Sequence, residues 1–205
     1  MGLVYNGLLK YDERLDIIGD LAEAWQVSED GLTFTFVLRP HVRWHDGAPL
    51  TAHDVAFTYE KLIDPNVRTP YSSSYELIES VEVVDDRTIQ IHYREPFAPA
   101  LESWMMGIIP KHLLEHEDLN VSRLLRDPIG TGPYRFRRWR TGELIELRAN
   151  TDYFAHRPYV DRYLYRIIPD QSTIFLELQA GGVDLGSLTP LQFQRMTDTA
   201  HFQDK

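Results

Sequence analysis

Cysteine is absent from the 205-residue chain, which excludes disulfide bonds, cysteine-ligated metal sites and thiol catalysis. No apolar run approaches the roughly 20 residues that a membrane-spanning helix needs. Lysine is scarce, because only four of the 21 basic residues are lysines. With 31 acidic residues the formal net charge is -10. This balance argues against nucleic acid as a partner, since phosphate neutralisation requires clustered Lys and Arg.

Neither end of the sequence has the pattern of a complete protein. Met1-Gly2 leads directly into "LVYNGLL", which has the composition of a folded interior and not of a secretory leader. The other end, "TDTAHFQDK", has no closing helix or strand pattern. We therefore expect a piece excised from a longer chain.

Strands and helices are interspersed without a strict repeat. Apolar residues recur at period two over 34–38, which predicts a strand that ends before Pro40. Thr51 followed three residues later by Asp54 forms a capping-box pattern. This pattern predicts an amphipathic helix that begins directly after Thr51.

Two β-hairpins are predicted, one turning at 85–86 and the other at 141–142. With the helices between them they favour a mixed α/β (α+β) architecture, with hairpins in a mixed sheet and flanking helices. The remaining predicted elements are a helical turn ending near Trp25, two short helices within 99–117, a strand over 163–169, a capped helix over 170–181 and a short strand over 183–188.

The segment "IGTGPYRFRRW" resembles a phosphate-binding loop only superficially. Gly130 and Gly132 are not spaced as in a P-loop or a dinucleotide-binding fingerprint. Pro133 removes an amide donor, and the chain enters a strand where an anion site would need a helix N-terminus. A tight turn that leads into a hairpin is the better interpretation.

Histidine pairs at helical spacing raise the question of a metal site. His112 and His116 lie four residues apart on a predicted helix, and His41 and His45 share this spacing across a loop. A catalytic zinc site needs three protein ligands and a structural site four. Exposed helix histidines are the better interpretation, and no metal ligand is predicted.

Catalytic patterns are also missing. There is no G-x-S-x-G nucleophile motif, and the serines of "YSSSY" (71–75) have no neighbouring histidine base. The Asp85-Asp86 pair falls in a predicted turn, where solvated charge accounts for it. We therefore predict no catalytic residue and no cofactor, and a protein that is not an enzyme.

Aromatic and methionine side chains in predicted loops are candidates for a binding cleft. Such side chains provide a large apolar contact area without charge specificity. Packing into the core is the alternative for each of them. They are Tyr5, Tyr71, Tyr75, Trp104, Met105 and Met106.

The run "LAEAWQVSEDGLTFTFVLRPHVRWHDGAPLTAHDVAFTYEKL" resembles the signature of the family 5 extracellular solute-binding proteins, the peptide and nickel receptors of ABC importers. Further blocks follow in the family's order, among them "IIPKHLL", "IGTGPYRF" and "RPYVDRYLYRIIPDQSTIFLELQAGGVDL". His41 departs from the pattern, because it stands where the family has a small turn residue such as Gly. His41 must therefore accept the backbone geometry of that turn or shift it.

The resemblance implies lobe I of a type II periplasmic-binding-protein-like fold, truncated near the crossover to lobe II. Residues 1–205 would form this single truncated lobe. Within it, 20–125 would be an inserted subdomain-like segment and 126–205 the remainder of the lobe I sheet. The ligand contacts that the resemblance implies are Tyr5, Asn6, Tyr71, Ser73, Tyr75, Trp104, Met105 and Met106.

The resemblance further implies a receptor that captures small peptides and delivers them to ABC permease subunits without chemistry. Its expected location is periplasmic or extracellular, with a lipoprotein anchor as an option. Truncation would expose apolar surface that favours a dimer. Three alternatives remain open: a nickel or metallophore receptor on the same fold, an oligosaccharide receptor on the same fold, and a secreted hydrolase.

Overall fold

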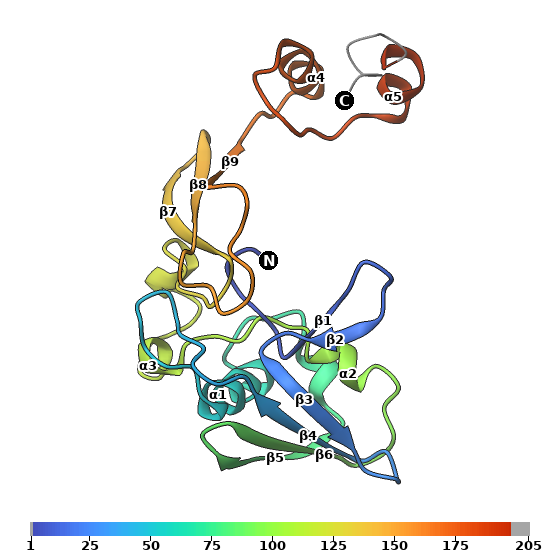
Figure 1. Cartoon of the computed structure of the whole chain (residues 1–205), viewed down its shortest axis with the longest axis vertical. Coiled ribbons are helices and arrows are strands. Elements are labelled where there is room, and N and C mark those ends of the chain that lie inside the picture. Colours follow the sequence, from blue (N-terminus) through green and yellow to red (C-terminus); the bar gives the residue numbers. More distant parts are fainter. Residues whose placement is uncertain (1, 198–205) are drawn as a thin grey trace. The chain divides into compact units, whose positions relative to one another are not determined.

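The computed structural model describes residues 2–197, which fall into two compact units (Figure 1). The first unit comprises Met1–Trp139 and Glu146–Tyr163, and the second comprises Arg140–Ile145 and Leu164–Lys205. The expected subdivision of the chain into 20–125 and 126–205 stays a prediction.

A four-stranded antiparallel sheet forms the centre of the first unit, in the order β3-β4-β6-β5. The alternation predicted over 34–38 is confirmed, because Phe34, Phe36 and Leu38 are buried while their neighbours are half-buried. The hairpin that turns at Asp85 and Asp86 is confirmed as well. The strands are β3 (Ala22–Val27), β4 (Thr33–Leu38), β5 (Ile78–Asp85) and β6 (Thr88–Tyr93).

The helical turn expected to end near Trp25 is wrong. Its residues form strand β3, in which Trp25 lies opposite Phe36 of β4. The composition "LAEAW" favours a helix locally, but helix propensity is a weak preference, and pairing with a buried strand overrides it.

Helix α1 (Ala52–Ile63) packs against β5 and β6 (Figure 1). The predicted capping box at its start is present, with the Thr51 N–H donating to Asp54 Oδ2 at 2.9 Å. The other oxygen, Asp54 Oδ1, accepts the Lys111 N–H at 2.9 Å. One buried carboxylate therefore holds the starts of two helices together. The shorter elements of this unit are β1 (Leu9–Tyr11), β2 (Ile17–Gly19), η1 (Ser72–Tyr75), α2 (Ala100–Ser103), α3 (Lys111–Leu114) and η2 (Arg123–Leu125).

The second sheet has three strands in the order β7-β8-β9. Its strands β7 and β8 form the hairpin predicted to turn at Thr141 and Gly142. The strand expected over 163–169 is β9, which is shorter. These strands are β7 (Tyr134–Arg140), β8 (Leu144–Ala149) and β9 (Arg162–Arg166).

Two helices dominate the described part of the second unit. Helix α4 (Gln171–Ala180) confirms the capped helix, since Asp170 Oδ1 accepts the Thr173 N–H at 2.7 Å and Gly181 ends the helix in the left-handed region. The strand expected over 183–188 is wrong, because those residues have no regular secondary structure. Helix α5 (Pro190–Met196) was not predicted, although its capping box begins at Thr189.

Several large apolar side chains of the second unit are exposed. Leu176 is 61% exposed, Leu185 80% and Phe193 67%. The dimer expected from exposed apolar surface is untested and stays a prediction. Within 2–197, no helix combines the length and apolar character that crossing a bilayer requires. Residues 198–205, which make up most of "TDTAHFQDK", lie outside the described part of the chain.

The turn expected in "IGTGPY" is present and lies against the N-terminal segment. Val4 O accepts the Gly132 N–H at 2.8 Å, and Leu3 O accepts the Tyr134 N–H at 2.8 Å. A Cβ atom added at Gly130 would lie 1.8 Å from Val4 O. Glycine is required at position 130 by this close approach of two backbones, and not by an anion.

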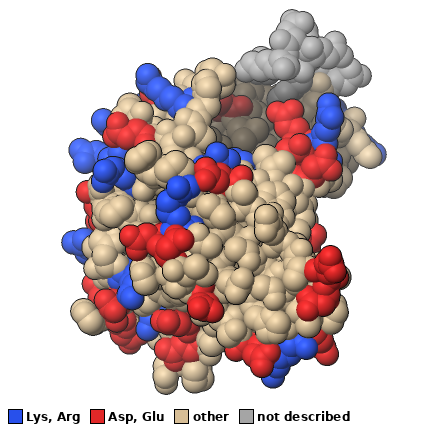
Figure 2. All heavy atoms as spheres, turned by 60° about the horizontal axis from the view of Figure 1, so that its bottom comes forward, with Lys and Arg blue, Asp and Glu red and all other residues tan. Residues whose placement is uncertain are grey.

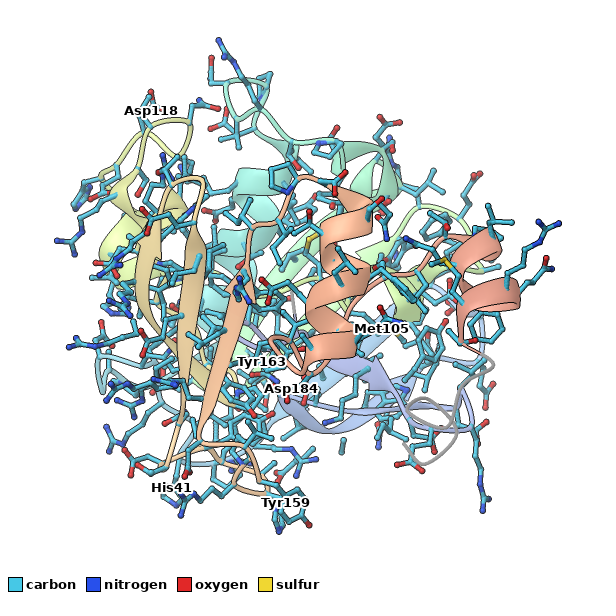
Figure 3. All side chains as sticks on the ribbon, turned by 90° about the horizontal axis from the view of Figure 1, so that it is seen from above. His41, Met105, Asp118, Tyr159, Tyr163 and Asp184 are labelled. Carbon is cyan, nitrogen blue, oxygen red and sulfur yellow. The ribbon has the colours of Figure 1, made fainter. Side chains whose placement is uncertain are left out.

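The same turn is held from its other side by His45, which is buried. His45 Nε2 donates to Gly132 O at 2.9 Å, and Nδ1 accepts the Gly130 N–H at 3.2 Å. Acceptance at Nδ1 requires the neutral ring. His41, four residues earlier, has a φ of 64° and thus accepts the left-handed turn geometry at the periphery of the unit (Figure 3).

Replacement of Gly130 by Ala is expected to destabilise the protein by about 1–3 kcal/mol or more, because the added methyl group overlaps Val4 O. Urea denaturation measures the change in the free energy of unfolding. Gly2→Ala is the matched control, since nothing lies within 4 Å of a Cβ there. Equal stability of the two variants would contradict the close approach.

The free energy of unfolding is expected to fall as the pH is lowered from about 8 to about 5. Burial lowers the pKa of His45 below its ordinary value. The unfolded chain therefore gains a proton at a higher pH than the folded chain, so acid favours unfolding. Urea denaturation at several pH values should show a shallower dependence for His45→Gln. The same dependence in both proteins would contradict this role.

Candidate functional site

A cleft of about 430 Å³ lies within the first unit, and most of its lining is apolar. Its size falls in the range of small-molecule sites, about 300–1,000 Å³. We call it the apolar cleft. It is lined by Tyr5, Thr58, Lys61, Leu62, Val67, Arg68, Thr69, Tyr71, Met106, Gly107, Ile109, Leu119, Asn120 and Leu125.

Two chain segments that pair backbone to backbone position Tyr5 and Met106. The Ile108 N–H donates to Asn6 O at 2.9 Å, next to both lining residues. A Cβ atom at Gly107 would lie 2.8 Å from Tyr5 Cβ, so a larger residue would separate the segments. Burial raises the pKa of Tyr5 to about 12. Its hydroxyl thus stays protonated and can both donate and accept a hydrogen bond.

Helix α1 supplies one wall of the apolar cleft. Thr58 Oγ1 donates to Asp54 O at 2.8 Å and accepts the Ile109 N–H at 3.0 Å. Thr58 therefore fixes the segment that carries Ile109 against the helix. One turn further on, Lys61 Nζ lies 5.2 Å from the centroid of the Phe57 ring, a cation–π distance.

Two loops that are about fifty residues apart in the sequence form the opposite wall. Asn120 joins them, because its Oδ1 accepts the Arg68 N–H at 2.9 Å and its Nδ2 donates to Asn66 O at 2.9 Å. This side chain therefore ties the loop that carries Val67 and Arg68 to the loop of Leu119.

Three of the eight predicted ligand contacts come together in the apolar cleft. Tyr5, Tyr71 and Met106 line it, and Tyr71 is 43% exposed. Ser73 is exposed but lies outside the lining. Met105, labelled in Figure 3, packs against the core cluster instead of into the cleft.

The other predicted contacts are buried in the fold, and their burial argues against direct ligand binding. Tyr75 and Trp104 are each 1% exposed, and their rings pack edge to face with centroids 5.6 Å apart. The Trp104 indole donates to Tyr93 OH at 3.1 Å. Asn6 is 5% exposed and donates to Asp20 Oδ2 at 2.7 Å. These residues hold the scaffold together.

A second cleft of about 670 Å³ lies beside the loop that carries Val67. It is lined by Asp64, Glu76 and Arg94 among others, so its charges are mixed. Tyr75 contributes to its inner wall but exposes almost no surface there.

Sequence reasoning missed the polar residues of the apolar cleft, among them Lys61, Arg68 and Asn120. Lys61 could have been found from its place in the last turn of α1, on the side that carries Thr58. Asn120 bridges the loops through a contact with residue 68, and no local sequence pattern indicates this contact.

Charges elsewhere on the unit are mainly acidic. Figure 2 shows Asp and Glu side chains spread over one face, with Lys and Arg scattered among them. Within 2–197, no three or more His, Asp or Glu side chains gather in a way that could hold a metal ion. His112 and His116 are both exposed as expected, but only His112 lies in α3, where it pairs with Asp46 at 2.7 Å, and His116 lies in the turn that follows.

The profile of the bacterial extracellular solute-binding proteins, family 5 (middle), matches residues 16–204. The chain belongs to this family. Family 5 is a family of solute-binding receptors, and the fold is that of its solved members, as expected from the resemblance.

The chain is similar to several known proteins. The oligopeptide-binding protein AppA of Bacillus subtilis is 36% identical over 190 residues, 89% of this chain and 35% of the relative. Its structure with a nonapeptide has a TM-score of 0.89, with 32% identity over 97% of this chain and 40% of that one. The heme-binding protein A of Haemophilus influenzae is 35% identical, over 89% of this chain and 38% of the relative.

The structure of NikZ from Campylobacter jejuni in complex with Ni(L-His) is also closely similar. Its TM-score is 0.93, with 34% identity over 97% of this chain and 40% of that one. The chain thus spans between a third and two fifths of the length of the relatives it matches.

Replacement of Asn120 by Ala is expected to loosen the outer wall of the apolar cleft, because two hydrogen bonds between loops are lost. The expected loss of stability is about 1 kcal/mol. Hydrogen exchange of the Arg68 amide should rise more than that of core amides. Asn66→Ala is the matched control, since within residues 2–197 its side chain bonds to nearby Asp64 alone. Unchanged protection at Arg68 would contradict the role of Asn120.

Proposed function

We propose that the chain is part of the solute-binding component of an ABC importer, which captures small peptides and delivers them to permease subunits without chemical change. The observation that carries the proposal is the apolar cleft, with Tyr5, Tyr71 and Met106 in its lining. It lies on the scaffold of a family whose members include an oligopeptide-binding protein of 36% identity.

The lining suits a peptide for physical reasons. Aromatic rings and the flexible thioether of Met106 accept apolar side chains of varied shape. Thr69, Asn120 and the protonated Tyr5 hydroxyl offer donors and acceptors to peptide amides. A receptor that must bind many sequences gains from apolar contact that does not depend on one particular side chain.

The family description places its members outside the cytoplasm, and we propose a periplasmic or extracellular location with an optional lipid anchor. A metal chelate or heme is the second candidate solute. It is favoured by the TM-score of 0.93 with the Ni(L-His) complex of NikZ and by the 35% identity to a heme-binding protein.

The full-length protein that contains this chain should be stabilised by di- to pentapeptides in a thermal-shift and calorimetry screen. A ligand at a hundredfold excess over its Kd stabilises by about 2.7 kcal/mol. Tyr71→Ala should weaken binding with little change in stability, because Tyr71 lines the cleft and is 43% exposed. Tyr11→Ala is the matched control, since Tyr11 is also 43% exposed but lies outside the lining.

The same screen separates the candidate solutes. A response only to nickel with histidine, or only to heme or to oligosaccharides, would keep the fold and refute the peptide proposal. Turnover of a peptide or glycan would refute the receptor proposal and favour the alternative that the protein is a secreted hydrolase.

A further inference from the structure

We propose that the second cleft is a separate binding site for a small zwitterion, a free amino acid with an aliphatic side chain, in which Arg94 binds the carboxylate and Asp64 and Glu76 bind the ammonium group. Among the described residues, the linings of the two clefts have Val67 alone in common. The proposal therefore does not depend on the proposed peptide-binding function of the apolar cleft.

Four parts of the first unit form the second cleft. Helix α1 contributes its last turns, β5 its first residue, and the chain directly after β6 contributes Arg94. The segment 64–76 supplies the rest. The volume of about 670 Å³ lies within the range of small-molecule sites and leaves room for a single amino acid.

The inner wall of the second cleft is fixed by the core. Tyr75 OH donates to Ser103 O at 2.7 Å, and its ring packs against that of Tyr59 with centroids 6.4 Å apart. Ile78, beside it in the lining, is also buried. The apolar surface that would receive an aliphatic side chain is thus formed before a ligand binds.

Arg94 is available to an anion. Its guanidinium donates to the backbone carbonyl of Glu76, and within residues 2–197 it forms no ion pair with a carboxylate. A guanidinium group carries five N–H donors and can hold a carboxylate through two parallel hydrogen bonds. Most donors of Arg94 therefore remain for a ligand.

The two carboxylates of the lining are available to a cation. Asp64 Oδ1 accepts the Asn66 N–H at 2.9 Å and Asn66 Nδ2 at 3.0 Å, and these bonds hold the pKa of Asp64 below its ordinary value. Asp64 Oδ2 and both carboxylate oxygens of Glu76 have no hydrogen-bond partner within residues 2–197. Three acceptor atoms are thus left for an ammonium group.

The hydroxyl of Tyr59 is a further uncommitted polar group. Tyr59 is half-buried, and its hydroxyl has no hydrogen-bond partner among residues 2–197. Burial raises the pKa of Tyr59, and the charge of Arg94 opposes this rise. The protonated hydroxyl near Arg94 can donate to the same carboxylate that the guanidinium binds.

Charge complementarity selects a zwitterion among small solutes. A purely anionic ligand would meet Asp64 and Glu76, and a purely cationic one would meet Arg94. Like charges placed together oppose binding, so a molecule that carries both charges is favoured over either. The aliphatic side chain follows from Ile63, Val67 and Ile78 in the lining.

The test compares L-leucine with two analogues of nearly the same shape. Leucinamide lacks the carboxylate, and 4-methylpentanoate lacks the ammonium group. Calorimetry on the full-length protein gives the Kd of each probe. We expect each analogue to bind about tenfold more weakly than L-leucine, because one charged hydrogen-bonded contact is lost.

Variants of the lining assign each charge to its partner. In Arg94→Gln the difference between L-leucine and leucinamide should disappear, and in Glu76→Gln the difference between L-leucine and 4-methylpentanoate should shrink. Arg43→Gln is the matched control for Arg94, since Arg43 is also exposed, donates to a backbone carbonyl and lies outside the lining. Glu29→Gln is the control for Glu76, since Glu29 is exposed and also lies outside it.

The outcomes separate this proposal from the proposed function. Tyr71→Ala, which alters the apolar cleft, should leave L-leucine binding unchanged. If it weakens L-leucine binding while Arg94→Gln does not, the amino acid occupies the apolar cleft and the proposal is wrong. Equal binding of the three probes, or binding of none, also refutes the proposal, and neither result bears on peptide binding. Failure of peptides to bind while L-leucine binds would refute the proposed function alone.

Discussion

The close approach of the N-terminal segment to two glycine-containing segments is the constraint on which the first unit depends. Val4 O meets the turn at Gly130 and Gly132, and Asn6 O meets the segment that contains Gly107. Side chains at these glycines would separate the backbones by more than a hydrogen bond can span. Backbone packing therefore places Tyr5 and Met106 next to each other at the cleft.

Much of the fold could be predicted because its determinants are local. The period-two pattern over 34–38 and the capping box at Thr51 each lie within a few residues, and both are confirmed. The helical turn predicted for β3 is wrong because its local composition favours a helix, whereas pairing with β4 sets its conformation. Helix α5 has a capping box in its sequence, but its seven residues are too few to show a clear period.

The candidate site was harder to predict, since exposure is a property of the whole fold. Trp104 and Tyr75 lie beside serine, methionine and glycine, the neighbours expected of a binding loop. Their burial follows from contacts with Tyr93 and Ser103 that sequence spacing cannot reveal. Tyr71 remains exposed, although it lies only four residues from Tyr75. Three of the eight expected contacts line the cleft, and their role in binding stays a prediction.

Several buried polar groups that join distant segments lie outside the apolar cleft, whereas Thr58 and Asn120 in its lining also hold segments together. Buried polar groups such as Asn6, Asp20 and Asp54 join distant segments, and none of them lines the apolar cleft. The cleft residues Arg68 and Tyr71 are exposed and contribute little to the core. Substitution at exposed cleft positions therefore costs little folding free energy. The exposed cleft positions can therefore vary at little cost to the fold, and relatives that share this fold are named for oligopeptides, for Ni(L-His) and for heme.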